Sequence, residues 1–119
     1  MSEGHRMTES CIFCKIIAGQ IPSKKVFEND ELLAFHDIHP WAPVHVLVIP
    51  KTHIATLSDI DDSHAPLLGR MLALAPKLMK ELGVTNGFRT VLNTGPDGGQ
   101  EVLHLHLHVM GGPRPWLKG

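Results

Sequence analysis

The sequence His104-Leu105-His106-Leu107-His108-Val109 alternates imidazole side chains with aliphatic ones. Because successive side chains of a β-strand point to opposite faces, this period of two predicts a strand from Leu103 to Met110. The three histidines would then project from one face, while the leucines, Leu103 included, and Val109 would face a core. A row of imidazoles is an unfavourable choice for a strand face without a function, because each ring carries a hydrogen-bond donor and an acceptor that need partners. We therefore favour a catalytic row over a metal-binding face or a solvated polar face.

The loop before this stretch, Gly98-Gly99-Gln100, favours phosphate chemistry. Glycines allow a close approach of the backbone, and successive N–H groups can cradle phosphate oxygens. A neutral imidazole is a competent nucleophile toward phosphorus, and a second histidine can protonate a leaving group near neutral pH. The pattern predicts attack on a phosphate ester, anhydride or amidate through a phosphohistidine-type intermediate, and that step requires no metal.

Outside this stretch, the hydrophobic periodicity predicts an antiparallel α+β fold. Apolar residues at steps of three and four indicate a long helix that begins near 59–63 and ends at Gly83, with a kink near Pro76. The Asn29-Asp30 turn joins two strands as a hairpin, and βαβ alternation is missing. Ser10 is the expected N-cap of a short helix. The expected elements are helices at 10–19 and 59–83 and strands at 24–28, 32–37, 45–49, 88–93 and 103–110.

Composition limits the class of protein. The chain has 119 residues, about one domain, and its 43% hydrophobic and 19% charged residues are ordinary for a globular protein. Eleven Lys and Arg against twelve Asp and Glu leave no basic field for nucleic acid. Since no apolar run reaches the roughly 20 residues of a membrane helix and no secretory signal is visible, we expect a cytoplasmic protein without membrane contact. We expect a flexible arm at 1–9 and a single domain at 10–119.

The cysteines Cys11 and Cys14 form a C-x-x-C pair. In a reducing compartment this spacing is typical of a metal or redox site rather than of a structural disulfide. A tetrahedral zinc site needs four ligands, so the pair would supply half of one.

Further motifs accompany the histidine stretch. They are Phe13-Cys14-Lys15-Ile16-Ile17, Ala34-Phe35-His36-Asp37-Ile38, Ala42-Pro43-Val44-His45, Val48-Ile49-Pro50-Lys51 and Asp97-Gly98-Gly99-Gln100. Together with His104 to His108 and the following Val109-Met110-Gly111-Gly112, they resemble the histidine-triad (HIT) superfamily, in particular its Hint branch. The resemblance extends from Cys11 to Trp116. It implies a HIT-like fold with a five-stranded antiparallel sheet, one long and one short helix, and a homodimer with a continuous ten-stranded sheet.

The resemblance implies an enzyme that hydrolyses purine nucleoside 5′-phosphoramidates, such as adenosine 5′-monophosphoramidate, and releases a nucleoside monophosphate. An alternative within the same superfamily is a dinucleoside polyphosphate hydrolase of the Fhit type. A protein that binds nucleotides without catalysis, and a zinc-binding structural module, are the alternatives outside enzymology. The sequence leaves adenine and guanine equally open.

The resemblance also assigns catalytic roles. His106 would be the nucleophile that becomes nucleotidylated, and His108 would contact the phosphate and help the leaving group depart. His45 would belong to the histidine network behind the nucleophile. Phosphate oxygens would be bound by Asn93 and by the backbone of Gly99 and Gln100.

The nucleoside would be bound by residues nearer the N-terminus. Asp37 fits the ribose position, because a carboxylate can accept two hydroxyl hydrogens, although it could instead cap the turn before Pro40. Phe13, Ile16, Phe35 and Ile38 would wall the base pocket, with His36 at its side. Phe35 fits a plain core position equally well, and His36 fits a surface strand. Trp116 in the C-terminal tail would reach the partner subunit's site and shape leaving-group specificity.

Two features depart from the Hint pattern. Glu101 stands where many Hint relatives have a serine that touches phosphate, and since a carboxylate repels phosphate we expect Glu101 to point elsewhere or act through a water. The Cys11/Cys14 pair is absent from animal Hint proteins but occurs in other members of the superfamily. There it joins a histidine after the Pro-Lys turn and the first triad histidine, here His53 and His104. The resemblance thus implies a Cys2His2 structural zinc site.

Overall fold

The computed structural model describes residues 10–117, whose core is one five-stranded antiparallel sheet of order β1-β2-β3-β5-β4. This confirms the fold class. The expected arm at 1–9 lies outside the described residues. The strands are β1 (Lys25–Glu28), β2 (Leu32–His36), β3 (Val44–Pro50), β4 (Phe88–Val91) and β5 (Leu107–Gly111). The helices are α2 (Ile12–Ile17) and α3 (Ala65–Glu81), with 3-10 turns η1 (Leu57–Asp59) and η2 (Asp62–His64) before α3.

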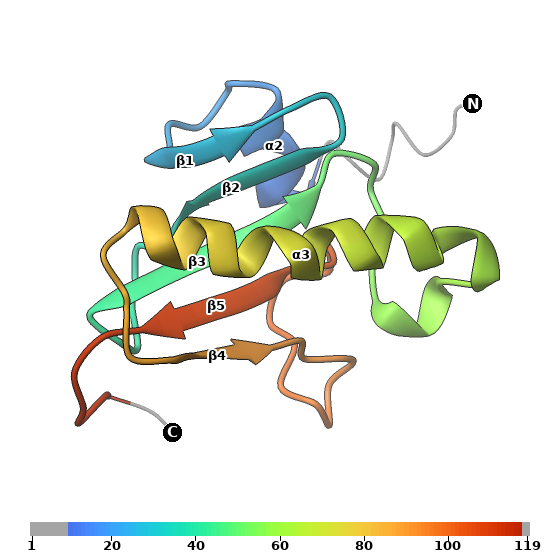
Figure 1. Cartoon of the computed structure of the whole chain (residues 1–119). Coiled ribbons are helices and arrows are strands. Elements are labelled where there is room, and N and C mark those ends of the chain that lie inside the picture. Colours follow the sequence, from blue (N-terminus) through green and yellow to red (C-terminus); the bar gives the residue numbers. More distant parts are fainter. Residues whose placement is uncertain (1–9, 118–119) are drawn as a thin grey trace.

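The two faces of the sheet carry different helices (Figure 1). Long α3 buries its apolar stripe, including Met71 and Leu78, against one face, and Pro76 lies inside this single helix. Short α2 packs Phe13 and Ile16 on the other face. Because side chains alternate along each strand, Leu105, Leu107 and Val109 join the α3 core, as the histidine stretch predicted.

Strand β5 is shorter than predicted. It begins at Leu107, so His104 and His106 precede the sheet, and Leu103 is 61% exposed instead of buried. The reason is that the N–H of Leu105 donates to the carbonyl of Ile54 at 2.7 Å, in the segment after β3, and does not join the ladder. Leu103 therefore lies outside the paired strand, whereas the alternation still places Leu105 in the α3 core.

Smaller differences occur at the element ends. The N-cap of α2 is Cys11, whose Sγ accepts the Cys14 N–H at 3.3 Å, in place of Ser10. Pro50 is the last residue of β3 rather than a residue after it. The signals at 59–63 form 3-10 turns with their own capping boxes, and α3 starts at Ala65. Among the described residues, no helix is long and apolar enough to cross a membrane.

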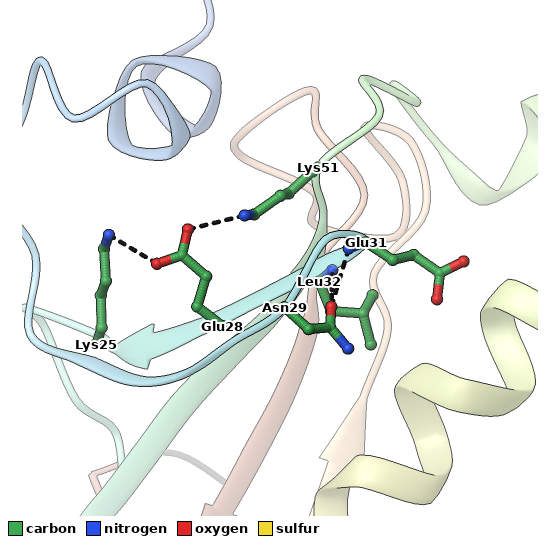
Figure 2. Close-up of polar contacts among 6 residues, drawn as sticks. All are labelled: Lys25, Glu28, Asn29, Glu31, Leu32 and Lys51. Atoms are coloured by element: carbon green, nitrogen blue, oxygen red, sulfur yellow. Dashed lines mark hydrogen bonds and ion pairs between the residues drawn. The ribbon is translucent and has the colours of Figure 1, made fainter.

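The β1–β2 hairpin turns at Asn29, as predicted, and Figure 2 shows its polar contacts. The Asn29 Oδ1 accepts the N–H groups of Glu31 and Leu32, at 2.9 and 2.7 Å, which fixes the turn. Lys25 and Lys51 both pair with Glu28, at 2.9 and 2.8 Å. Water and salt weaken such surface pairs, so the sheet depends mainly on its buried faces.

Candidate active site and metal centre

A cavity of about 650 Å³ opens on the face of the sheet that carries α2. Its walls come from α2, the ends of β2 and β4, the loop after β2, the glycine loop before Glu101, and the histidine stretch. The predicted site residues that line it are Phe13, Ile16, Phe35, His36, Asp37, Ile38, Asn93, Gly99, His106 and His108. Residues from 13 to 108 in the chain thus meet at one largely apolar cavity that also carries polar groups.

His106 has one ring nitrogen committed to the backbone. Its Nδ1 lies 2.7 Å from the carbonyl oxygen of His104, and since a carbonyl only accepts, Nδ1 carries the proton and donates. The Nε2 therefore keeps its lone pair, which is the atom a nucleophilic imidazole needs. Phe13 packs its ring against His106 edge to face, at 5.1 Å between centroids. Burial lowers the pKa of His106, while the charges of Asp37 and Glu101 oppose that shift. The ring is thus held neutral and oriented.

His45 and His108 form a hydrogen-bonded couple beside it. The N–H of Trp41 donates to His45 Nδ1 at 3.0 Å, so the proton of neutral His45 is on Nε2. That Nε2 lies 2.9 Å from His108 Nδ1 and donates to it. The Nε2 of His108 consequently carries a proton, and His108 lines the cavity. Burial lowers the pKa of His108 to about 4 and also lowers that of His45, so both are neutral at pH 7.

Asp37 contacts both the turn after β2 and the histidine couple. Its Oδ1 accepts the His39 N–H at 2.8 Å, the turn-capping role that the sequence left open. Its Oδ2 lies 3.5 Å from His45 Nε2. The ligand atoms of Asp37, His45 and His108 lie close enough together to hold a metal ion. However, Nε2 of His45 carries the only proton of that ring, and this proton would have to leave before Nε2 could bind a cation. Asp37 and His108 thus both face the single Nε2–H of His45, which places a carboxylate beside the histidine couple.

Trp41 is a site residue that sequence reasoning missed. Its indole stacks on the His108 ring, with centroids 5.1 Å apart and planes 13° apart, and it lines the cavity. Sequence patterns assign no role to Trp41. The available signal was the spacing: Trp41 stands four residues before His45, at the entry to the strand that carries it.

The glycine loop is closed by its own hydrogen bonds. The N–H of Gly99 donates to the carbonyl of Pro96 at 3.1 Å, and that of Gln100 donates to Gly95 at 3.0 Å. The Gln100 amide oxygen accepts the Gly95 N–H, and its nitrogen donates to the carbonyls of Ala55 and Val102. Gln100 therefore braces the loop from behind, whereas Gly98 and Gly99 lie on the cavity wall.

Charged residues line the cavity beyond the histidines. Glu101 lines the cavity and its charge opposes the lowering of the His106 pKa, while its expected action through a water stays a prediction. Arg89 from β4 also lines the cavity and was not predicted. Trp116 is not among the lining residues: its indole N–H donates to the Gly112 carbonyl at 3.0 Å, and the Arg114 guanidinium lies 3.9 Å from its ring.

The four predicted metal ligands, Cys11, Cys14, His53 and His104, lie together next to the active site. Cys14 Sγ is 3.2 Å from His53 Nδ1, and Cys11 Sγ is 3.3 Å from His104 Nδ1. The two Nδ1 atoms are 3.2 Å apart. In a tetrahedral zinc site with bonds of about 2.0–2.3 Å, neighbouring ligand atoms are about 3.3–3.8 Å apart, so the cluster has the size of such a site.

The protonation of the cluster also suits a metal. His104 Nε2 donates to the Pro50 carbonyl at 2.8 Å, which leaves a lone pair on Nδ1, the atom that faces the sulfurs. Burial raises the pKa of the Cys14 thiol to about 12 and lowers that of His104 to about 4. Without a cation the Cys14 thiol would stay protonated, whereas a divalent cation favours its thiolate. The residues therefore fit zinc.

Comparison with known proteins agrees with this geometry. Residues 10–117 match the family described as "Scavenger mRNA decapping enzyme C-term binding". The chain belongs to the histidine-triad family. It is 50% identical over 105 residues to Protein HitA of Neisseria gonorrhoeae, covering 88% of this chain and 98% of that protein. It is 45% identical over 107 residues to the purine nucleoside phosphoramidase of Escherichia coli K12, covering 89% and 90% of the two chains.

Solved structures of histidine-triad proteins have the same fold. The HIT family hydrolase from Legionella pneumophila Philadelphia 1 superimposes with a TM-score of 0.85 at 49% identity, covering 88% of this chain and 95% of that one. A histidine triad protein from Clostridium difficile gives a TM-score of 0.86 at 45% identity, covering 97% and 96%. The histidine-triad fold expected from the sequence is thus confirmed.

Proposed function

We propose that this histidine-triad hydrolase cleaves nucleoside 5′-phosphoramidates to nucleoside monophosphates through a nucleotidyl intermediate on His106. The observation that carries the proposal is the pair of opposite tautomers beside one cavity. His106 has a free lone pair on Nε2, and His108 has a proton on Nε2. The 45% identity to a protein named purine nucleoside phosphoramidase supports this choice of substrate.

In the first step the Nε2 of His106 attacks phosphorus and a new P–N bond forms. The bond between phosphorus and the leaving amine breaks, and the amine takes a proton from Nε2 of His108. The positive charge on the nucleotidylated ring is stabilised by the Nδ1–H bond to the His104 carbonyl, at 2.7 Å.

The donated proton belongs to the group Asp37, His45 and His108, which carries one extra proton in the complex. The negative phosphate favours that proton and offsets the burial that keeps His108 neutral in the free protein. In the second step water attacks phosphorus, the bond to His106 breaks, and the proton of the water returns to the same group. The sum is substrate plus water giving amine plus nucleoside monophosphate.

The remaining cavity walls supply the nucleotide contacts. We assign the ribose hydroxyls to Asp37, whose Oδ2 is free of the turn bond that occupies Oδ1. The apolar end, with Phe13, Ile16 and Phe35, suits a flat purine ring, and Ile38 is 83% exposed at the wall, where a bound base would cover it. Asn93 and the Gly98–Gly99 loop are assigned to the phosphate.

Zinc would be held by Cys11, Cys14, His53 and His104, and when bound it supplies structural crosslinking rather than a reacting centre. These ligands come from the start of α2, the segment after β3 and the segment before β5. His104 is two residues from His106, and its carbonyl accepts the His106 Nδ1–H. The cluster thus fixes the peptide that orients the nucleophile.

The homodimer expected from the family resemblance also remains a proposal. Leu72 on α3 and Phe88 on edge strand β4 are 52% and 41% exposed, and a small apolar cavity lies between these elements. Both features suit burial against a second copy. Sedimentation equilibrium should give about twice the chain mass of 13.1 kDa, and a monomer at micromolar concentration would contradict the proposal.

The test of the function uses two substrates and two variants. Wild-type protein should hydrolyse adenosine 5′-phosphoramidate with a higher kcat/KM than a diadenosine polyphosphate. His106→Ala should lose about 10³-fold or more in kcat with an unchanged unfolding midpoint. His106→Gly should regain turnover when imidazole is added, because the free base fills the vacated position. A higher kcat/KM for the dinucleotide would favour the polyphosphate hydrolase, and a His106→Ala protein that is fully active would refute the mechanism.

A further inference from the structure

Trp41 touches both members of the histidine couple, through different atoms. It lies in the loop between β2 and β3, and its backbone N–H donates to His45 Nδ1 at 3.0 Å. Its indole stacks on His108, with 5.1 Å between centroids and 13° between planes, and is tilted against His45 at 5.3 Å. The proposed function assigns this residue no role.

The backbone of Trp41 is fixed from two sides. Besides the bond to His45, its carbonyl accepts the N–H of Leu117 at 2.8 Å, which ties the C-terminal segment to the loop. Both bonds belong to the peptide and not to the indole. Exchange of the side chain therefore leaves the tautomer of His45 in place, and the effect of the indole can be measured separately.

The indole supplies a restraint that His108 otherwise lacks. The hydrogen bond of His108 within the couple is made through Nδ1, at 2.9 Å from His45 Nε2. The His108 ring is attached at Cγ and hydrogen-bonded at Nδ1, and small rotations about its side-chain torsions still tilt the ring plane and displace the other nitrogen, Nε2. The parallel indole lies against the ring face, while His106 is on another side at 5.0 Å and 59°. A stacked flat surface opposes such tilting.

We propose that Trp41 is a positioning residue for His108, which aims its Nε2–H at the leaving group. This rests on the proposed function, in which His108 donates that proton. The consequence is selective: Trp41 matters where the leaving group needs a proton, and does not matter where the leaving group departs as a stable anion.

The experiment compares two leaving groups on the same nucleotide. One is an alkylamine phosphoramidate of adenosine, whose amine must be protonated, and the other is the p-nitrophenyl ester of AMP, whose phenolate need not be. In single turnovers, Trp41→Ala should lower the rate of adduct formation on His106 about tenfold for the amine, with little change in substrate affinity, and less than about twofold for the ester. Trp41→Phe should restore the amine rate, because phenylalanine offers a flat face at the same place.

A second measurement does not depend on activity. In wild-type protein the His108 ring protons should resonate upfield of their positions in Trp41→Ala, owing to the ring current of the stacked indole, and in Trp41→Phe the shift should be partly kept. Equal losses for the two substrates, no loss for either, or no change in the His108 signals would each overturn the proposal. A wild-type protein that forms no adduct on His106 would instead overturn the proposed function.

Discussion

Gly98→Ala is a sharp test of the glycine loop, because the structure shows why position 98 needs glycine. A Cβ at Gly98 would lie 2.9 Å from the nitrogen and 3.0 Å from the carbonyl carbon of Thr94, and nearer still to its oxygen. All three atoms are backbone, so no side-chain rotation can relieve the contact. Gly99 offers a matched control: its φ is +80°, but its Cβ would meet nothing within 4 Å.

The size of the effect follows from the bonds that close the loop. These are the bonds of the Gly99 and Gln100 N–H groups to Pro96 and Gly95, and the bond of the Gly95 N–H to the Gln100 side chain, at 3.0 to 3.1 Å. If the loop opens to admit a methyl group, losing two or three of them costs about 2–3 kcal/mol of unfolding free energy. Displacing the loop by about 1 Å should lower kcat/KM about 10²-fold. Gly99→Ala bears only backbone strain, about 1 kcal/mol.

Urea denaturation and steady-state hydrolysis of adenosine 5′-phosphoramidate measure both effects on the same preparations. The unfolding free energy and kcat/KM should both be highest for wild type, lower for Gly99→Ala and lowest for Gly98→Ala. Gly98→Ala protein within twofold of wild type in kcat/KM would show that the loop geometry is not needed for phosphate binding. A Gly99→Ala protein as damaged as Gly98→Ala would show that strain, and not the clash with Thr94, governs the loop.

Three further predictions concern the metal cluster and the charges of the site. Cys14→Ser should remove the zinc found by metal analysis of untagged protein and lower Tm by several degrees, and an unchanged zinc content would contradict the assigned ligands. Because burial lowers the pKa of His108 from an unfolded value near 6.5 to about 4, its contribution to stability is complete above pH 6.5. It should be lost as pH falls toward 4, by up to about 3 kcal/mol, and in urea titrations His108→Asn should flatten this dependence. Glu101→Gln should tighten AMP binding two- to fivefold in calorimetry by removing a carboxylate beside the phosphate, and an unchanged Kd even at low salt would refute that placement.

The sequence predicted most of the fold because local patterns and global packing agree in it. The alternation through Val109 put Leu105 and Leu107 in the α3 core, and the Asn29 turn joined β1 to β2. The prediction failed at Leu103, where the backbone of Leu105 pairs with Ile54 rather than with a strand. That pairing joins residues far apart in the chain, and a local alternation of side chains cannot predict it.

Most of the candidate site followed from motifs, and the exceptions have physical reasons. Trp41 stacks on His108, which lies 67 positions further along the chain. This contact depends on the path of the loop between β2 and β3, which the sequence pattern does not give. The role of Gln100 as a brace depends on the carbonyl of Ala55, which the sequence does not place beside it. Glu101 lines the cavity because it follows Gly99 in the loop, and its action on phosphate through a water stays a prediction.

Mass spectrometry can detect directly whether His106 forms a covalent bond to the nucleotide. The protein would be mixed with the p-nitrophenyl ester of AMP, whose fast leaving group lets the adduct accumulate, quenched at alkaline pH and digested. We expect a mass increase of one nucleoside monophosphate residue on the peptide that contains His106, and no such increase in His106→Ala. Turnover without an adduct, or an adduct on another residue, would contradict it.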